Sequence, residues 1–320
     1  GCASLPPPQP RHESRAMADV GQTTLGKLAR ANAPQTPVGR DGPLSAFRLL
    51  PDAAFAFDAR ISLARNAENT LDVQYYLFHN DASGKWIAAA LLAAADRGVR
   101  VRVLIDDVDT ADKEIGLATL NAHPNIEVRL FNPFHARSGN LLVRGWQALS
   151  DGARLNRRMH NKAFIADNQL GITGGRNIGD EYFDASTEFS FVDLDVLATG
   201  PIVDAMSRSF DAYWNSPAVV PAAALPVAVS QSRLDRASVR LRAFSEAQTA
   251  SAYGRAIAAA DPLPALLSGR LPWHPAPADL IVDPPEKAID PEQSPSSLLV
   301  GQLAGLWIDP TRRALIVSPS

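Results

Sequence analysis

Six positions between residues 160 and 177 combine the residue types and the spacing needed to bind and cleave a phosphodiester. His160 and Lys162 stand two residues apart, Asp167 follows them, and the segment ends with Gly174-Gly175-Arg176-Asn177. Alternate side chains of a strand point to the same face, so the imidazole and the ammonium are expected in one site. A neutral imidazole can attack phosphorus while cations and amides hold the phosphate oxygens. The segment therefore predicts cleavage or transfer of a phosphodiester through a phosphohistidine intermediate.

The other positions of the segment are expected to support this chemistry. Gly174 and Gly175 carry no side chain, so the backbone and Asn177 are expected to approach a phosphate closely. Asp167 is expected in the turn between two short strands. The scheme requires no metal, and no group of histidine, cysteine and aspartate in the sequence has the spacing of metal ligands. The sequence therefore predicts no cofactor.

The complete pattern resembles the catalytic motif of the phospholipase D superfamily, and similarity to that family extends over roughly residues 44–214. The resemblance implies a mixed sheet covered by helices, with His160 as the nucleophile. It also implies an acidic residue beyond the motif that orients this histidine. Asp193 is the candidate for that role, with Asp195 or Glu188 as alternatives.

Within the superfamily, the chain is most similar to the cardiolipin synthase-like bacterial lipoproteins. Two segments of the second half, Leu271–Trp273 and Val282–Lys287, suggest this branch. The resemblance implies a phospholipid substrate and an alcohol or water acceptor. Gly1-Cys2 is typical of a processed lipoprotein, so Cys2 is the expected lipidation site, and Ala3 favours the outer membrane. The expected location is the periplasmic side of the cell envelope, with the lipid anchor in the membrane.

The sequence contains one copy of a motif that superfamily enzymes use twice. In those enzymes the second histidine serves as general acid for the leaving group. This chain has six histidines, and only His160 is followed by a lysine two residues later. The site is therefore expected to need a missing second half or, as in single-motif nucleases, a second chain. The remaining alternative is a non-catalytic lipoprotein in which the former catalytic site serves as a binding scaffold.

Hydrophobic periodicity predicts an α/β fold in which helices and strands alternate. Asp52 is the expected N-cap of the first helix, and Gly98 is the expected C-cap of the second. The expected helices are 52–66, 83–97, 113–122, 201–214, 246–260 and 296–307, with a further one at 141–149. The expected strands are 69–78, 99–105, 126–131, 162–166, 169–173, 189–197, 279–282 and 314–317.

Composition divides the chain into three expected parts: a flexible lipoprotein tether (1–43), a phospholipase D-like domain (44–216), and a linker with the start of a second such domain (217–320). The last helix and strand repeat the order of the first pair, which favours an incomplete second copy. The net charge of −3 gives no general attraction for nucleic acid. A basic cluster of Arg154, Arg157 and Arg158 is expected to meet phospholipid headgroups equally well, so nucleic acid is an unlikely partner.

Overall fold

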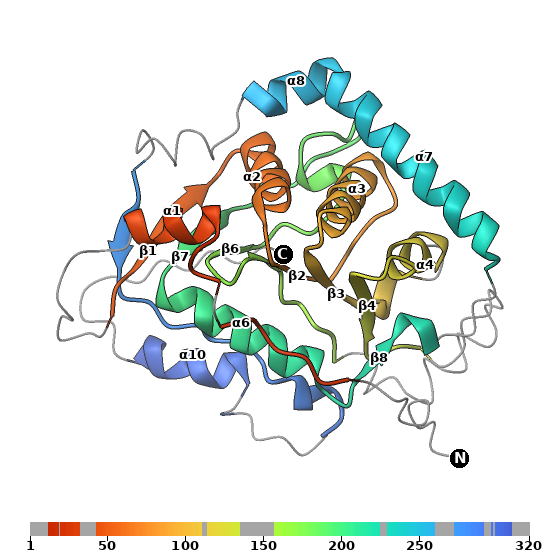
Figure 1. Cartoon of the computed structure of the whole chain (residues 1–320). Coiled ribbons are helices and arrows are strands. Elements are labelled where there is room, and N and C mark those ends of the chain that lie inside the picture. Colours follow the sequence, from red (N-terminus) through yellow and green to blue (C-terminus); the bar gives the residue numbers. More distant parts are fainter. Residues whose placement is uncertain are drawn as a thin grey trace, which may run out of the picture.

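The computed structural model is a mixed sheet with helices on both faces (Figure 1). It describes residues 12–18, 20–32, 43–110, 114–134, 157–224, 229–259, 272–290, 296 and 298–308. Within these residues the sheet has nine strands in the order β8-β4-β3-β2-β5-β6-β7-β1-β9, which confirms the predicted α/β class. The strands are β1 (Ser45–Leu50), β2 (Thr70–Tyr75), β3 (Arg100–Asp106), β4 (Ile126–Phe131), β5 (Ala163–Ala166), β6 (Leu170–Gly174), β7 (Asp195–Thr199), β8 (Val219–Pro221) and β9 (His274–Ala276). The helices are α1 (Thr24–Asn32), α2 (Ala53–Asn66), α3 (Ala82–Asp96), α4 (Glu114–Asn121), α6 (Pro201–Trp214), α7 (Gln231–Ala250), α8 (Ala252–Ala259) and α10 (Leu299–Ile308).

The centre of the sheet combines parallel and antiparallel pairs. β2, β3 and β4 are parallel because helical connections return the chain to the same end of the sheet. β5 and β6 form an antiparallel hairpin, and β5 pairs with β2. The hairpin turn has positive φ at Asp167 (50°) and Asn168 (47°), a conformation that Asp and Asn tolerate well. This hairpin places the catalytic motif in the middle of the sheet.

Two apolar cores flank the sheet. On one face, α1, α2, α3 and α4 cover the buried side chains of β2, β3 and β4, including Val73 and Val103. On the other face, α6 packs against Leu104, Ile165 and their neighbours. α7 lies outside α3 and α4, with α8 beyond it (Figure 1). In the described part of the chain, no helix combines the length and the apolar character that a bilayer span needs.

The expected tether is wrong for the residues that the structure describes. Leu25 and Leu28 of α1 are buried in the first core, and Glu68 accepts a hydrogen bond from Thr24 N at 2.7 Å, which caps the helix. Ahead of α1, the chain crosses the sheet, where Arg102 Nη1 donates to Ser14 O at 2.9 Å and Arg129 Nη2 donates to His12 O at 2.7 Å. Buried arginines on the sheet therefore hold this segment in place.

The strand expected at 189–197 is shorter than predicted. β7 begins at Asp195 because both of its neighbours end there: Asp195 pairs with Gly174 of β6 and with Leu50 of β1. Residues 189–194 lie outside the sheet and leave four large apolar side chains exposed. The alternation of apolar residues therefore predicted too long a strand, because residues 189–194 have no neighbouring strand to pair with among the described residues.

Three further elements differ from the predictions downstream of α6. The domain boundary expected at 216–225 contains β8, which pairs with β4 and extends the same sheet. The strand expected at 279–282 is absent from the described residues; β9 pairs with β1 instead. α7 begins at Gln231, earlier than the helix predicted from residue 246. The expected helix 141–149, the expected strand 314–317 and Cys2 lie outside the described residues.

Candidate active site

The segment that carries His160 is anchored by the end of β3. Asp106 accepts a hydrogen bond from Met159 N at 2.8 Å and forms an ion pair with Arg158 Nη1 at 3.1 Å. Burial raises the pKa of Asp106 to about 6, although the charge of Arg158 opposes this change. Met159 is buried, so the next residue emerges at the surface beside β2 and β5. These contacts fix the backbone at the start of the motif.

His160 and Lys162 meet on the ring of Tyr76. The imidazole stacks on this ring with centroids 4.1 Å apart, and Lys162 Nζ lies 5.7 Å from the ring centroid. Lys162 Nζ also donates to His160 O at 2.8 Å. Both residues lie in the extended segment just before β5 rather than within the strand. The structure therefore brings together the two residues that the motif predicted, with Tyr76 as a shared support that the sequence analysis did not identify.

The electrostatic environment favours the neutral imidazole. Burial, Lys162 and Lys287 lower the pKa of His160 below its ordinary value, while the charge of Asp283 opposes this change. Burial also lowers the pKa of Lys162, against the opposing charges of Asp193 and Asp195. A neutral imidazole beside an ammonium is the combination that a nucleophile needs near a phosphate anion.

A cavity of about 230 Å³ opens beside the pair. His160, Lys162, Thr173 and Gly174 line it, together with Gln74 of β2. Residues 280–283, Leu299 and Met206 also belong to the lining, which therefore combines apolar residues with Asp283. The site is therefore built by the motif and by a segment far downstream in the sequence.

The downstream segment is firmly attached to the domain. Tyr213 donates its hydroxyl to Asp283 O at 2.8 Å, and Leu299 N donates to Asp283 Oδ1 at 2.7 Å. Arg157 Nη1 donates to Lys287 O at 3.2 Å and to Asp290 O at 3.0 Å. In the sequence, the resemblance to the cardiolipin synthase-like branch pointed to Val282–Lys287. It did not predict that this segment lies at the site.

Asp167 is not part of this cavity. It follows β5, at the opposite end of the strand from Lys162, and is fully buried. Its carboxylate accepts hydrogen bonds from the backbone N–H groups of Glu68, Asn69 and Thr70 at 2.8 to 3.2 Å. Here the third residue of the motif holds the start of β2 against the β5–β6 turn.

The two glycines make room for carboxylates. A Cβ atom on Gly174 would overlap Asp195, and one on Gly175 would overlap the carboxylate of Asp193. Gly174 also lines the cavity, as a phosphate-approach role requires. Acidic side chains of the chain therefore lie against both glycines, and the close approach of a phosphate stays a prediction.

Asp193 and Asp195 have different environments. Asp195 is buried and pairs with Arg60 Nη2 at 2.9 Å and Arg176 Nη1 at 3.5 Å. Asp193 accepts a hydrogen bond from Leu194 N at 2.8 Å, and its charge acts on Lys162. Within the described residues, the carboxylate whose charge acts on His160 is Asp283 instead. The structure thus places Asp193 beside the lysine, and the alternative Glu188 lies exposed outside the cavity.

The Asn177 side chain is engaged away from the cavity. Its Oδ1 accepts from Leu77 N at 3.1 Å, and its Nδ2 donates to the Tyr182 hydroxyl at 3.0 Å. Leu77 directly follows Tyr76, so the amide holds the loop on which His160 stacks. The predicted direct phosphate contact is replaced, in this structure, by a contact that positions Tyr76.

Two of the three arginines of the expected basic cluster, Arg157 and Arg158, lie in the described part of the chain, and both are engaged by other groups of the protein. Arg158 pairs with buried Asp106 and stacks on Phe134 at 4.6 Å, and Arg157 binds carbonyl groups of the downstream segment. Arg154 lies outside the described residues. These arginines therefore build the site rather than offer a groove to a polyanion.

Comparisons with known proteins match this architecture. The family model described as "Cardiolipin synthase, PLD-like domain" matches residues 61–214. Cardiolipin synthase C of Escherichia coli (strain K12) is 42% identical over 263 residues, which cover 82% of this chain and 54% of the relative. An uncharacterized protein of Helicobacter pylori (strain J99) is 39% identical over 225 residues, which cover 70% of this chain and 43% of the relative.

Among solved structures, phosphatidylserine synthase from Haemophilus influenzae Rd KW20 matches with a TM-score of 0.44 and 16% identity, over 71% of this chain and 49% of that one. The chain spans about half the length of the curated relatives named above. The motif, its place in the mixed sheet and the family match agree. Residues 61–214 form a domain of the phospholipase D superfamily, and the chain is similar to cardiolipin synthase C.

Proposed function

We propose that this chain supplies the nucleophilic half of a site that transfers a phosphatidyl group to an alcohol, or to water, through a phosphohistidine at His160. The observation that carries the proposal is the stacked His160 and Lys162 pair at the wall of a cavity, with the pKa of His160 lowered. The 42% identity to cardiolipin synthase C of Escherichia coli supports a phospholipid substrate.

The proposed reaction has two displacement steps. An imidazole nitrogen of His160 forms a bond to phosphorus as the bond to the first alkoxide breaks, and an acid delivers a proton to that alkoxide. The oxygen of the acceptor then displaces the imidazole and loses its proton to a base. Lys162 stabilises the charge on the phosphate oxygens in both steps.

The acid and base are proposed to come from outside this motif. Only His160 among the six histidines is followed by the required lysine. A second half of a longer protein, or a second copy of the chain, is therefore proposed to contribute the partner histidine. The matched regions cover only 54% and 43% of these two relatives, which favours the first source.

Trapping of the intermediate tests the proposal. The chain, in its longest available form, is mixed with phospholipid labelled in the phosphate, quenched, and digested under conditions that preserve phosphohistidine. Label is expected on the peptide that contains His160 and is expected to vanish in His160→Ala, whereas His123→Ala retains it. Label that appears only on another residue contradicts the assignment of the nucleophile.

We also propose that a lipid on Cys2 anchors the chain to the periplasmic side of the cell envelope, with the outer membrane favoured by Ala3. The Gly1-Cys2 start supports this proposal. Mass spectrometry of the amino-terminal peptide is expected to find acyl groups on the cysteine, and Cys2→Ser is expected to release the protein from washed membranes. Retention of Cys2→Ser on membranes washed with high salt argues for a different anchor.

A further inference from the structure

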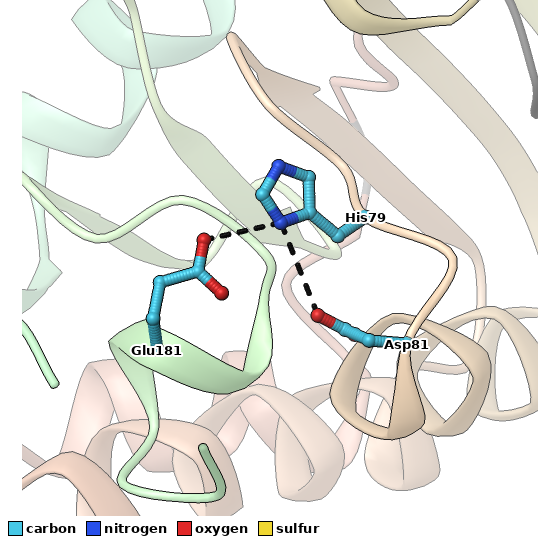
Figure 2. Close-up of side chains that lie close together, drawn as sticks. All are labelled: His79, Asp81 and Glu181. Carbon is cyan, nitrogen blue, oxygen red and sulfur yellow. Dashed lines mark ion pairs between the residues drawn. The ribbon is translucent and has the colours of Figure 1, made fainter. Parts of the chain in front are cut away.

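A second cluster of potential ligands lies outside the catalytic cavity. His79 and Asp81 belong to the loop between β2 and α3, and Glu181 belongs to the short 3-10 helix Asp180–Tyr182 (Figure 2). His79 Nδ1 lies 3.1 Å from Glu181 Oε1 and 3.9 Å from Asp81 Oδ2. All three side chains are partly buried, with 14 to 29% of their surface exposed. They converge although Glu181 is distant from the other two in sequence.

The separations fit a metal ion without a large rearrangement. One atom from each residue lies within 4.8 Å of the other two. Zinc-to-ligand distances of about 2.0 to 2.2 Å put neighbouring ligand atoms roughly 3 to 3.5 Å apart. The pair of His79 and Glu181 already meets this requirement, and a small rotation brings Asp81 into range. One imidazole and two carboxylates suit zinc or manganese, with solvent in the remaining positions.

The backbone holds the two ligand-bearing loops together. His79 N donates to Ile178 O at 2.8 Å, and Asp180 N donates to Asp81 Oδ2 at 2.8 Å. Gly84 N donates to Asp81 Oδ1 at 2.9 Å, so the aspartate also caps α3. The ligand positions are therefore set by contacts that do not depend on an ion, which reduces the ordering entropy that binding would otherwise cost.

A glycine lies where the ligands approach most closely. A Cβ atom on Gly179 would stand 2.9 Å from both His79 Nδ1 and Glu181 Oε2. Any other residue at this position would push the imidazole and the carboxylate apart. The backbone is therefore shaped so that these two groups can converge on one point.

The cluster also carries more negative than positive charge. Asp180 lies between the ligands in sequence and accepts hydrogen bonds from Ala82 N and Ser83 N. In the described part of the chain, no lysine or arginine forms an ion pair with Asp81, Asp180 or Glu181. The imidazole of His79 lies beside the carboxylates of Asp81 and Glu181. A divalent ion would neutralise the negative charge of the cluster.

We propose that His79, Asp81 and Glu181 bind one divalent transition-metal ion, zinc or manganese. The ion joins the loop that follows Tyr76 to the 3-10 helix that follows Asn177. It therefore stabilises the part of the fold that supports the stacked His160, without entering the catalytic cavity.

Metal binding to the tag-free chain tests this inference without any activity assay. The chain is stripped with chelator and titrated calorimetrically with zinc, and with manganese under electron paramagnetic resonance. One equivalent is expected to bind, with nitrogen coupling from one imidazole in the pulsed manganese spectrum. The thermal midpoint is expected to rise with metal, because binding to the folded state alone stabilises it.

Matched variants distinguish this site from adventitious binding. His79→Ala and Glu181→Ala are each expected to weaken binding at least about tenfold, in the range seen for metal-site substitutions, and His79→Ala is expected to remove the nitrogen coupling. His123→Ala is the control, since His123 Nε2 pairs with Asp96 alone at 3.3 Å. The inference is overturned if neither ion binds below millimolar concentration, or if both ligand variants bind like wild type while remaining folded by circular dichroism.

Discussion

At the residue scale, the environment of His160 is formed by groups from three parts of the chain. Tyr76 stacks on the imidazole, Lys162 donates to the backbone oxygen of His160, and the charge of Lys287 lowers the pKa of the imidazole. Burial contributes the largest part of the lowered pKa. Burial and the charges of Lys162 and Lys287 favour the neutral imidazole, which is the form that can attack phosphorus.

Removal of the downstream lysine is expected to raise the pKa of His160. Lys287→Met removes a positive charge that opposes protonation and frees Asp283 from its ion pair, and both changes favour the imidazolium. Proton NMR titration of the histidine resonances measures this shift, with His160→Ala for assignment and exposed Lys27→Met as the charge control. If the reaction rate depends on neutral His160, the rate of Lys287→Met is expected to rise at higher pH values than the rate of wild type. An unchanged or lowered pKa contradicts the electrostatic account.

Substitution of the third motif residue is expected to affect stability more than the geometry of the cavity. Asp167→Ala leaves three backbone N–H groups without their acceptor, at a cost of about 2 to 4 kcal/mol in the free energy of unfolding. Asp167→Asn keeps one acceptor oxygen and tolerates the positive φ, so it is expected to lose less. Urea denaturation measures both, with exposed Asp279→Ala as the control. Equal stability of Asp167→Ala and wild type excludes this structural role.

At the scale of elements, the segment before the domain behaves as part of the fold. α1 buries Leu25 and Leu28 under the sheet, and the residues before it lie along buried arginines. The composition of this region, rich in proline and polar residues, did not reveal these contacts. These contacts form because buried arginines of the sheet, such as Arg102, need hydrogen-bond acceptors for their guanidinium groups.

Truncation of the buried leucine in α1 tests this packing. Leu25→Ala removes a fully buried side chain and is expected to lower the free energy of unfolding by about 2 to 5 kcal/mol. A flexible tether would show no such loss. Lys27→Ala, on the exposed side of the same helix, is the matched control, and denaturant unfolding followed by circular dichroism measures all three proteins. A loss below about 0.5 kcal/mol for Leu25→Ala, the scale of ordinary surface substitutions, contradicts the docked position of α1.

At the scale of the whole molecule, this sequence contains one His-x-Lys motif, whereas the proposed reaction uses two. Residues 1–320 alone are expected to show no turnover of phosphatidylglycerol, because loss of general-acid help alone costs about 10² to 10⁴-fold in rate. A chromogenic phosphodiester and phosphatidylglycerol serve as substrates beside His160→Ala. Turnover that requires His160 and rises more than linearly with protein concentration would instead identify a dimer that completes the site.

The sequence by itself determined the features that depend on local spacing. The spacing of the motif predicted that His160 and Lys162 lie together, and the turn residues Asp167-Asn168 located the hairpin. Helix periodicity located α2, α3 and α6 to within a few residues. The motif also predicted the family, because its residue types and spacing are specific to this chemistry.

Only the tertiary structure decided which distant residues meet. Packing against α6 brings Asp283 and Lys287 to His160, and the neighbouring strands end β7 at Asp195, short of the predicted length. The same contacts give Asp167 and Asn177 structural partners and gather His79, Asp81 and Glu181. Such encounters depend on pairing between segments far apart in the chain, and neither periodicity nor local propensity contains that information.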